Sequence, residues 1–202
     1  MKDVASLIIE GNENTLKIIP FYKNEKQLIK KSASGDRGAQ GRLYEKYSPK
    51  MLGVCRRYVK DLQFAEDVMV KGFVKVFKSL ESFRYEGSFE GWIRKIMVRE
   101  SISHLRKNQF LVYDGSAMEQ ATSRTGDTSD DWDAEYIQSF IDALPDGYRT
   151  VFTLYAIEGY KHAEVAEILA ISESTSKSQL FKARKYLQEQ LVKENIVGYG
   201  TE

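Results

Sequence analysis

Apolar residues recur every three or four positions along two stretches of the chain, from about residue 24 to 110 and from 134 to 193. This spacing is typical of amphipathic helices and differs from the strict alternation of strands. Asn24 and Asp36 precede helical runs, where a side-chain oxygen can accept from a free backbone N–H, and Asp61 is expected to be a break between helices. Ser48-Pro49 is expected to break or kink the helix that follows Asp36, because proline lacks an N–H.

The strongest helical pattern in the first stretch covers Phe64–Leu80, and a last helix is expected over about Phe89–Lys107. Between them, Ser82–Gly91 is predicted to be a loop, since it contains Gly87 and Gly91.

The second stretch ends in two closely spaced helical segments, His162–Leu169 and Glu173–Leu191, joined by Ala170-Ile171-Ser172. A short helix, a tight capped turn and a longer helix form the helix-turn-helix that reads the major groove of DNA. The alternative is an ordinary helical hairpin with a solvated face. In the second helix, one face is mainly apolar, and the opposite face carries Ser174, Lys177, Ser178, Phe181, Lys182 and Lys185.

Residues 111–133 include polar and turn-forming residues and many acidic side chains. We therefore expect this segment to be a flexible linker. Residues 1–22 form an extension to which we assign no role. The expected fold is all-α, with two small helical domains, 23–110 and 134–202, joined by the linker.

Charge is unevenly distributed along the 202 residues, although the formal net charge is only +1. Residues 23–110 hold twenty basic and ten acidic side chains, whereas 111–133 hold one and six, and 134–202 hold seven and ten. A segment with net charge +10 indicates a polyanionic partner, with a merely solvated basic surface as the alternative.

Several classes of protein are disfavoured by composition. The apolar runs are too short for a membrane span or a secretory signal, and the only cysteine, Cys55, fits a reducing cytoplasm. The two histidines are far apart, so no metal site or cofactor is expected. No phosphate loop, nucleophile elbow or carboxylate pair appears, and we therefore expect no enzymatic activity.

Four aromatic residues gather in and after the Ser82–Gly91 loop, beside a basic helix. Aromatic rings offer stacking surfaces to unpaired bases, while cations follow the backbone. Phe89 and Trp92 fit a core role better, whereas Arg84 and Tyr85 are candidates for DNA contact.

Ala65-Glu66-Asp67-Val68, the run 72–77 and the run 89–107 resemble region 2 of the bacterial RNA polymerase sigma-70 family. Leu144-Pro145, Glu158-Gly159-Tyr160, the run 166–169 and the helix-turn-helix resemble its region 4. In this order and spacing, the motifs are similar to those of group-four, extracytoplasmic-function (ECF) sigma factors.

The resemblance implies a protein that binds core RNA polymerase and directs promoter-specific initiation. Its partners would be the β′ clamp helices, the β flap and promoter DNA, with an anti-sigma factor as a further candidate. The residues implied for contact with core polymerase are Asp67, Val70, Lys71, Phe73, Val74 and Phe77. Those implied for recognition and melting of the minus-ten element are Phe83, Arg84, Tyr85, Ser88, Arg94, Lys95, Arg99 and His104. Those implied for the minus-thirty-five element are His162, Ser174, Thr175, Lys177, Ser178, Gln179, Lys182 and Lys185.

The chain departs from the family pattern at four positions, the first of which is Val70, where the family often has a glutamine. Lys71 reverses a charge expected at the polymerase contact, while Ser176 and Gln179 replace a usual aliphatic residue and a usual arginine. We expect the inward-facing Ser176 hydroxyl to bond to the carbonyl four residues earlier, and Lys177 and Gln179 to read base edges. The alternative function is a helix-turn-helix regulator that acts without core polymerase.

Overall fold

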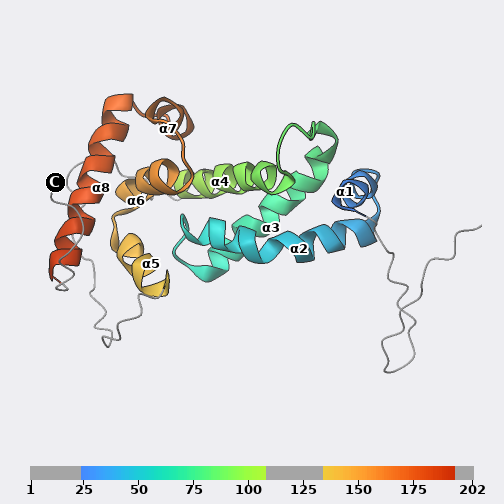
Figure 1. Ribbon diagram of the computed structural model, residues 1–202, viewed down its shortest axis with the longest axis horizontal. Helices are drawn as coiled ribbons and strands as arrows, with labels where there is room; N and C mark the ends of the chain where they lie inside the picture. The colour runs from blue at the N-terminus through green and yellow to red at the C-terminus, as the bar shows by residue number, and fades with distance from the viewer. Residues whose placement is uncertain (1–23, 108–133, 194–202) are drawn as a thin grey trace, which may run out of the picture.

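Helices make up all the regular structure in the described parts of the chain, residues 24–107 and 134–193 of a computed structural model (Figure 1). The all-α prediction is confirmed. The predicted extension (1–22) and linker (111–133) lie outside the described residues. The first lobe contains α1 (Glu25–Ala33), α2 (Arg37–Arg56), α3 (Leu62–Ser79), the 3₁₀ turn η1 (Leu80–Ser82) and α4 (Phe89–Lys107). The second lobe contains α5 (Ala134–Ala143), α6 (Asp146–Phe152), the π-helical turn η2 (Thr153–Ile157), α7 (His162–Leu169) and α8 (Glu173–Lys193).

Side-chain caps fix three helix starts in the first lobe. Asn24, Asp36 and Asp61 accept from the backbone N–H groups of Gln27, Ala39 and Phe64, at 2.9, 3.0 and 2.9 Å. The capping predictions for Asn24 and Asp36 are therefore confirmed, and Asp61, expected only as a break, also caps a helix. Each cap satisfies one of the free donors at its helix start.

The expected break at Pro49 is wrong, because α2 continues from Arg37 through Pro49 to Arg56. Tyr47 and Met51 are buried on either side of the proline, so the same face of the helix packs against the core before and after it. Tertiary packing of this face outweighs the local cost of proline, which is roughly 3 kcal/mol.

The core of the first lobe forms where α3 crosses α4. Gly72 of α3 is buried, and a Cβ built on it would overlap Sδ of Met97, which is itself fully buried in α4. On the other side of α3, the ring of Phe73 meets Tyr44 of α2 edge to face, with centroids 4.8 Å apart. Glycine at position 72 therefore sets how closely α3 and α4 approach each other.

The second lobe is built around α8, which packs against α6 and α7. Its own small core includes Leu144, Tyr148 and Ala183. Figure 1 shows this lobe at one end of the first, beside the ends of α2 and α4, while α1 lies at the opposite end.

The close approach at Gly72 predicts that Gly72→Ala destabilises the protein by about 1–3 kcal/mol, because the added methyl group overlaps Met97 in a filled core. The matched control is Gly41→Ala, since Gly41 is exposed inside α2 and has open space around its Cβ position. Alanine there should stabilise the protein by about 0.5–1 kcal/mol. Urea denaturation measures both changes, and a Gly72→Ala protein as stable as the Gly41→Ala protein would contradict the packing described.

Candidate nucleic-acid and polymerase interfaces

The turn between α7 and α8 has the local geometry of a helix-turn-helix. Ala170 ends α7 in the left-handed conformation, with φ of +53°. Two residues later, the Ser172 hydroxyl accepts from the backbone N–H of Thr175 at 3.0 Å and so caps α8. The predicted cap is confirmed, and it satisfies one of the free backbone donors at the start of α8.

The outward face of α8 is polar and cationic, as its sequence pattern predicts. The exposed residues on it are Ser174, Lys177, Ser178, Phe181, Lys182 and Lys185. Phe181 stands out as 69% exposed. Hydroxyl and ammonium groups can donate to base edges and phosphates, and an exposed aromatic ring can contact a thymine methyl group. Thr175, at the edge of this face, is half-buried and bonded through Oγ1 to the Ser172 hydroxyl.

The inward face of α8 corrects the expectation for Ser176. This residue is fully buried as predicted, but its Oγ lies 2.9 Å from Nδ1 of His162 in α7. The carbonyl of Ser172 already accepts the helical N–H of Ser176. Since the ring of His162 is stacked on Tyr155, with centroids 4.4 Å apart, it is held in place as the partner of the hydroxyl. The half-buried His162 thus braces α7 against α8.

Gln179 does not fit the role in base reading that was expected of it. Its side chain is only 2% exposed and lies on the buried side of α8 with Ser176 and Leu180. A helical period of 3.6 residues places positions 176, 179, 180 and 183 on one face. Gln179 is therefore removed from the set of residues that contact bases.

The loop before α4 divides its aromatic residues between core and surface. Phe83 is only 8% exposed, and its ring packs on Phe89 and Trp92 at centroid distances of 5.1 and 5.5 Å. The assignment of Phe83 to DNA contact is therefore corrected to a core role. Ser88 is exposed, and its hydroxyl accepts from the N–H of Gly91 at the start of α4.

Tyr85 is the exposed aromatic residue of this loop. Its backbone is left-handed, with φ of +58°, a conformation that is uncommon outside glycine and is concentrated at functional sites. The ring lies 4.7 Å from that of Phe83 and has the ammonium of Lys26 at 5.3 Å. Together with the exposed Arg84, it offers a stacking surface beside positive charge.

The basic residues of α4 face the second lobe. Lys95 and Arg99 line a cavity of about 440 Å³ whose opposite wall includes Tyr160, Glu164 and Glu167. His104 lies on a different side of α4, against Phe64 of α3, with ring centroids 5.7 Å apart. Burial and the nearby Lys71 lower the pKa of His104, and Asp67 opposes them. His104 is therefore separated from the other residues expected at the minus-ten element.

An exposed strip on α3 combines charge with apolar surface. Asp67, Val70, Lys71 and Val74 follow one another at helical spacing, and all four are exposed. Exposed valines side by side on a helix are typical of a docking surface. Phe73 is buried in the core and Phe77 is half-buried, so the assignment of Phe73 to polymerase contact is corrected to a core role.

Salt bridges between the lobes were not predicted from the sequence. The carboxylate of Glu158 in the second lobe lies 3.4 Å from both Arg57 and Arg94 of the first, and its side chain is only 3% exposed. Charge segregation along the chain is the signal that could have indicated such pairs, although it does not identify partners.

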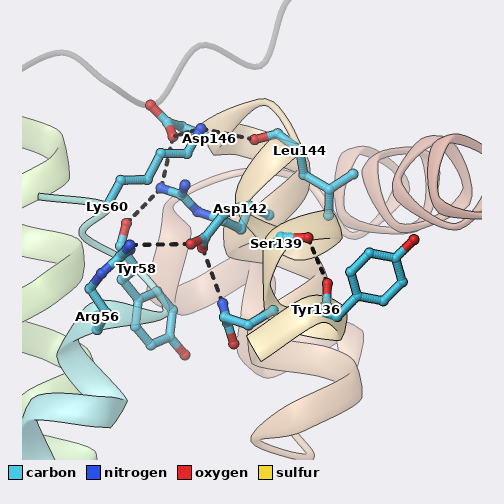
Figure 2. A network of polar contacts seen from close by, with 10 residues as sticks. Arg56, Tyr58, Lys60, Tyr136, Ser139, Asp142, Leu144 and Asp146 are labelled. Carbon is cyan, nitrogen blue, oxygen red and sulfur yellow. Dashed lines mark hydrogen bonds and ion pairs between the residues drawn. The ribbon is translucent and has the colours of Figure 1, made fainter. Parts of the chain in front are cut away.

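Further contacts join the end of α2 to α5 and α6 (Figure 2). Arg56 pairs with Asp142 at 3.3 Å, and Lys60 reaches both the carbonyl of Leu144 and the carboxylate of Asp146. Burial raises the pKa of Asp146, and the ammonium of Lys60 opposes that shift.

Arg149 also crosses between the lobes, and it is only 1% exposed. Its guanidinium donates to the backbone carbonyl of Tyr58 at 2.7 Å. Burial, reinforced by the charge of Glu158, raises the pKa of the Tyr58 hydroxyl well above its usual value. The lobe contact therefore encloses Tyr58 and Arg149 together.

No helix among the described residues has the length and apolar character required to cross a membrane. Across 24–107 and 134–193, no group of three or more His, Cys, Asp and Glu side chains is arranged to hold a metal ion.

A comparison with family profiles matches residues 43–110 to Sigma-70 region 2 and residues 134–187 to Sigma-70 region 4. The chain is similar to the RNA polymerase sigma factor SigV of Bacillus subtilis, with 32% identity over 69% of this chain and 82% of that protein. It is also similar to the RNA polymerase sigma-H factor of Pseudomonas aeruginosa (27% identity; 84% and 94% covered). A third relative is the ECF RNA polymerase sigma factor SigW of Bacillus subtilis (28% identity; 82% and 96% covered).

Two solved structures resemble the chain at 20% identity. One is CnrH in complex with the cytosolic domain of CnrY, covering 81% of this chain and 94% of that chain with a TM-score of 0.45. The other is the sigma factor RpoE of Bartonella quintana in complex with the anti-sigma factor NepR, covering 75% and 95% with a TM-score of 0.49.

The fold and the exposed face of α8 define a helical DNA-binding protein of the transcription machinery. The chain belongs to the sigma-70 family of RNA polymerase sigma factors, within its ECF group. It directs the initiation of transcription at promoters by core RNA polymerase.

The burial of Gln179 predicts that Gln179→Met leaves the base preference at the upstream promoter element unchanged, because this side chain does not reach the DNA. Ser178→Ala, one residue earlier on the exposed face, should alter preference at one base pair by about 1 kcal/mol or more if its hydroxyl reads a base edge. Selection from a randomised upstream element by the holoenzyme measures both. A changed base preference for Gln179→Met would contradict the inward placement of this residue.

Proposed function

We propose that the two lobes perform different steps of initiation through three exposed surfaces. The first lobe binds core polymerase through the α3 strip, and it recognises and melts the minus-ten element through the loop before α4 and the basic face of α4. The second lobe reads the minus-thirty-five element with α8 and touches the β flap.

The main support for this proposal is the polar and cationic outward face of α8, which follows a capped turn. Ser174, Lys177 and Ser178 lie in its first turns, where a recognition helix meets base edges. Lys182 and Lys185 lie one and two turns further along, at positions suited to phosphates. Positive charge without a preceding capped turn would support only non-specific binding.

The minus-ten assignment is supported by Tyr85 and Arg84 on an exposed loop. A base that leaves the duplex loses stacking, and an exposed aromatic ring replaces part of it at about 1–3 kcal/mol per base. Lys95 and Arg99 continue the positive surface along α4, where a phosphate backbone would run.

We propose no catalytic role for the chain itself. The thiol of Cys55 is buried, and burial raises its pKa to about 11, so it is protonated and inaccessible at neutral pH. Since the partner is core polymerase, the place of action is the cytoplasm. An anti-sigma factor is a candidate regulator on the basis of family membership alone.

Run-off transcription with core polymerase and a genomic promoter library tests the proposal. Specific start sites should appear only when the chain is added.

Val74→Asp should weaken core binding by at least about tenfold, because a charge would be placed in the apolar part of the α3 strip.

The control for this substitution is Val192→Asp, which makes the same change at an exposed valine in the last turn of α8. It should leave core binding unchanged. Specific DNA binding without any association with core polymerase would instead favour an independent helix-turn-helix regulator.

A further inference from the structure

We propose that α1 forms a further nucleic-acid contact, in which Lys26 and Lys30 bind phosphates of the unpaired strand on the downstream side of the minus-ten element. The inference rests on the proposed role of Arg84 and Tyr85 at that element. It adds a contact from α1, a helix that precedes the residues matched to Sigma-70 region 2.

Lys26 connects α1 to the exposed loop before α4. Its ammonium lies 5.3 Å from the centroid of the Tyr85 ring, and the ring of Phe83 also contacts Tyr85 at 4.7 Å. An ammonium near an aromatic ring is attracted by the electrons of that ring. A nucleotide stacked on Tyr85 would therefore carry its phosphate close to a cation that is already positioned there.

Lys30 extends this positive charge along α1. It follows Lys26 by one helical turn, so the two exposed side chains lie on one face, about 6 Å apart along the helix axis. Among the described residues, neither lysine pairs with a carboxylate. The acidic residue of α1, Glu25, is bonded instead to Lys46 and Tyr47. This face of α1 is therefore positively charged and accessible to a strand.

The order of the surfaces on the first lobe gives the strand its direction. The second lobe, which is proposed to read the upstream element, lies at one end of the first lobe, and α1 lies at the opposite end (Figure 1). Between them, α4 begins just after the Tyr85 loop and ends near the second lobe, where Arg106 donates to the carbonyl of Ile168. A strand that passes α4 and then Tyr85 therefore reaches α1 next, on the downstream side.

The chemistry of α1 favours a phosphate backbone over a protein partner. Its apolar residues Leu28 and Ile29 are buried, so its exposed surface lacks the apolar side chains that the α3 strip offers. A lysine ammonium binds phosphate as a point charge and carries no base preference. We therefore expect α1 to hold the strand without reading its sequence.

The test compares two fluorescent single-stranded oligonucleotides as ligands of the holoenzyme. Both carry the non-template minus-ten sequence of a promoter identified by run-off transcription. The short probe ends at the last base of the element, and the long probe continues downstream for about six thymidines. The holoenzyme should bind the long probe more tightly than the short one.

Lys30→Ala should reduce this advantage of the long probe at least about threefold and leave binding of the short probe unchanged. It should also lower the salt dependence of long-probe binding by about 0.7 in log–log slope, because one phosphate contact is lost. Lys26→Ala should likewise reduce the advantage, whereas Lys30→Arg should retain it.

Lys31→Ala is the matched control, because it removes the same charge from the same last turn of α1 at about 100° around the helix. It should change the advantage of the long probe by less than about twofold. The inference is overturned if the long probe binds no better than the short one, if Lys30→Ala weakens both probes equally, or if Lys31→Ala has the same effect.

Tyr85→Ala separates this inference from the proposed function. Weaker binding of the short probe by this variant supports the minus-ten assignment, whatever the lysine variants do. Unchanged binding of the short probe overturns that assignment, and the downstream path over α1 with it.

Discussion

A buried carboxylate needs compensating charge, and the ion pairs that Glu158 makes among the described residues cross the lobe boundary. Neither Arg57 nor Arg94 belongs to the lobe that supplies the carboxylate. A continuous hydrophobic core crosses the same boundary, since buried second-lobe residues that include Val151, Leu154 and Val165 cluster with the core of the first lobe. The placement of the second lobe at the end of the first therefore depends on apolar packing together with these ion pairs. Arg149 and Lys60 reinforce the same boundary through backbone carbonyls.

Three surfaces remain accessible in this arrangement. The α3 strip and the outward face of α8 are exposed while the lobes are in contact. On α4, Lys95, Arg99 and Arg106 are also exposed, although they line the cavity that faces the second lobe. Arg94 is half-buried and pairs with Glu158.

Local physics made much of the fold predictable from the sequence. Helix starts at Asn24, Asp36 and Asp61 follow from caps that involve only neighbouring residues.

The predictions that failed depend on contacts with other parts of the fold. Packing on both sides of Pro49 carried α2 through it, and the hydroxyl of Ser176 found its partner on another helix. The salt bridges to Glu158 join residues 101 and 64 positions apart, and no periodic pattern indicates such pairs. Gln179 was misplaced because its role was carried over from an arginine in the family pattern, whereas its position in the helical period places it on the buried face.

The most direct test is the distance between the lobes before and after core polymerase is added. Fluorescent labels at the exposed positions Glu45 of α2 and Gln188 of α8 would report it by single-molecule energy transfer. We expect high transfer in the free chain and a shift to low transfer in the holoenzyme on promoter DNA. Low transfer in the free chain would contradict the contact between the lobes, and high transfer that persists in the promoter complex would contradict their binding to two separate promoter elements.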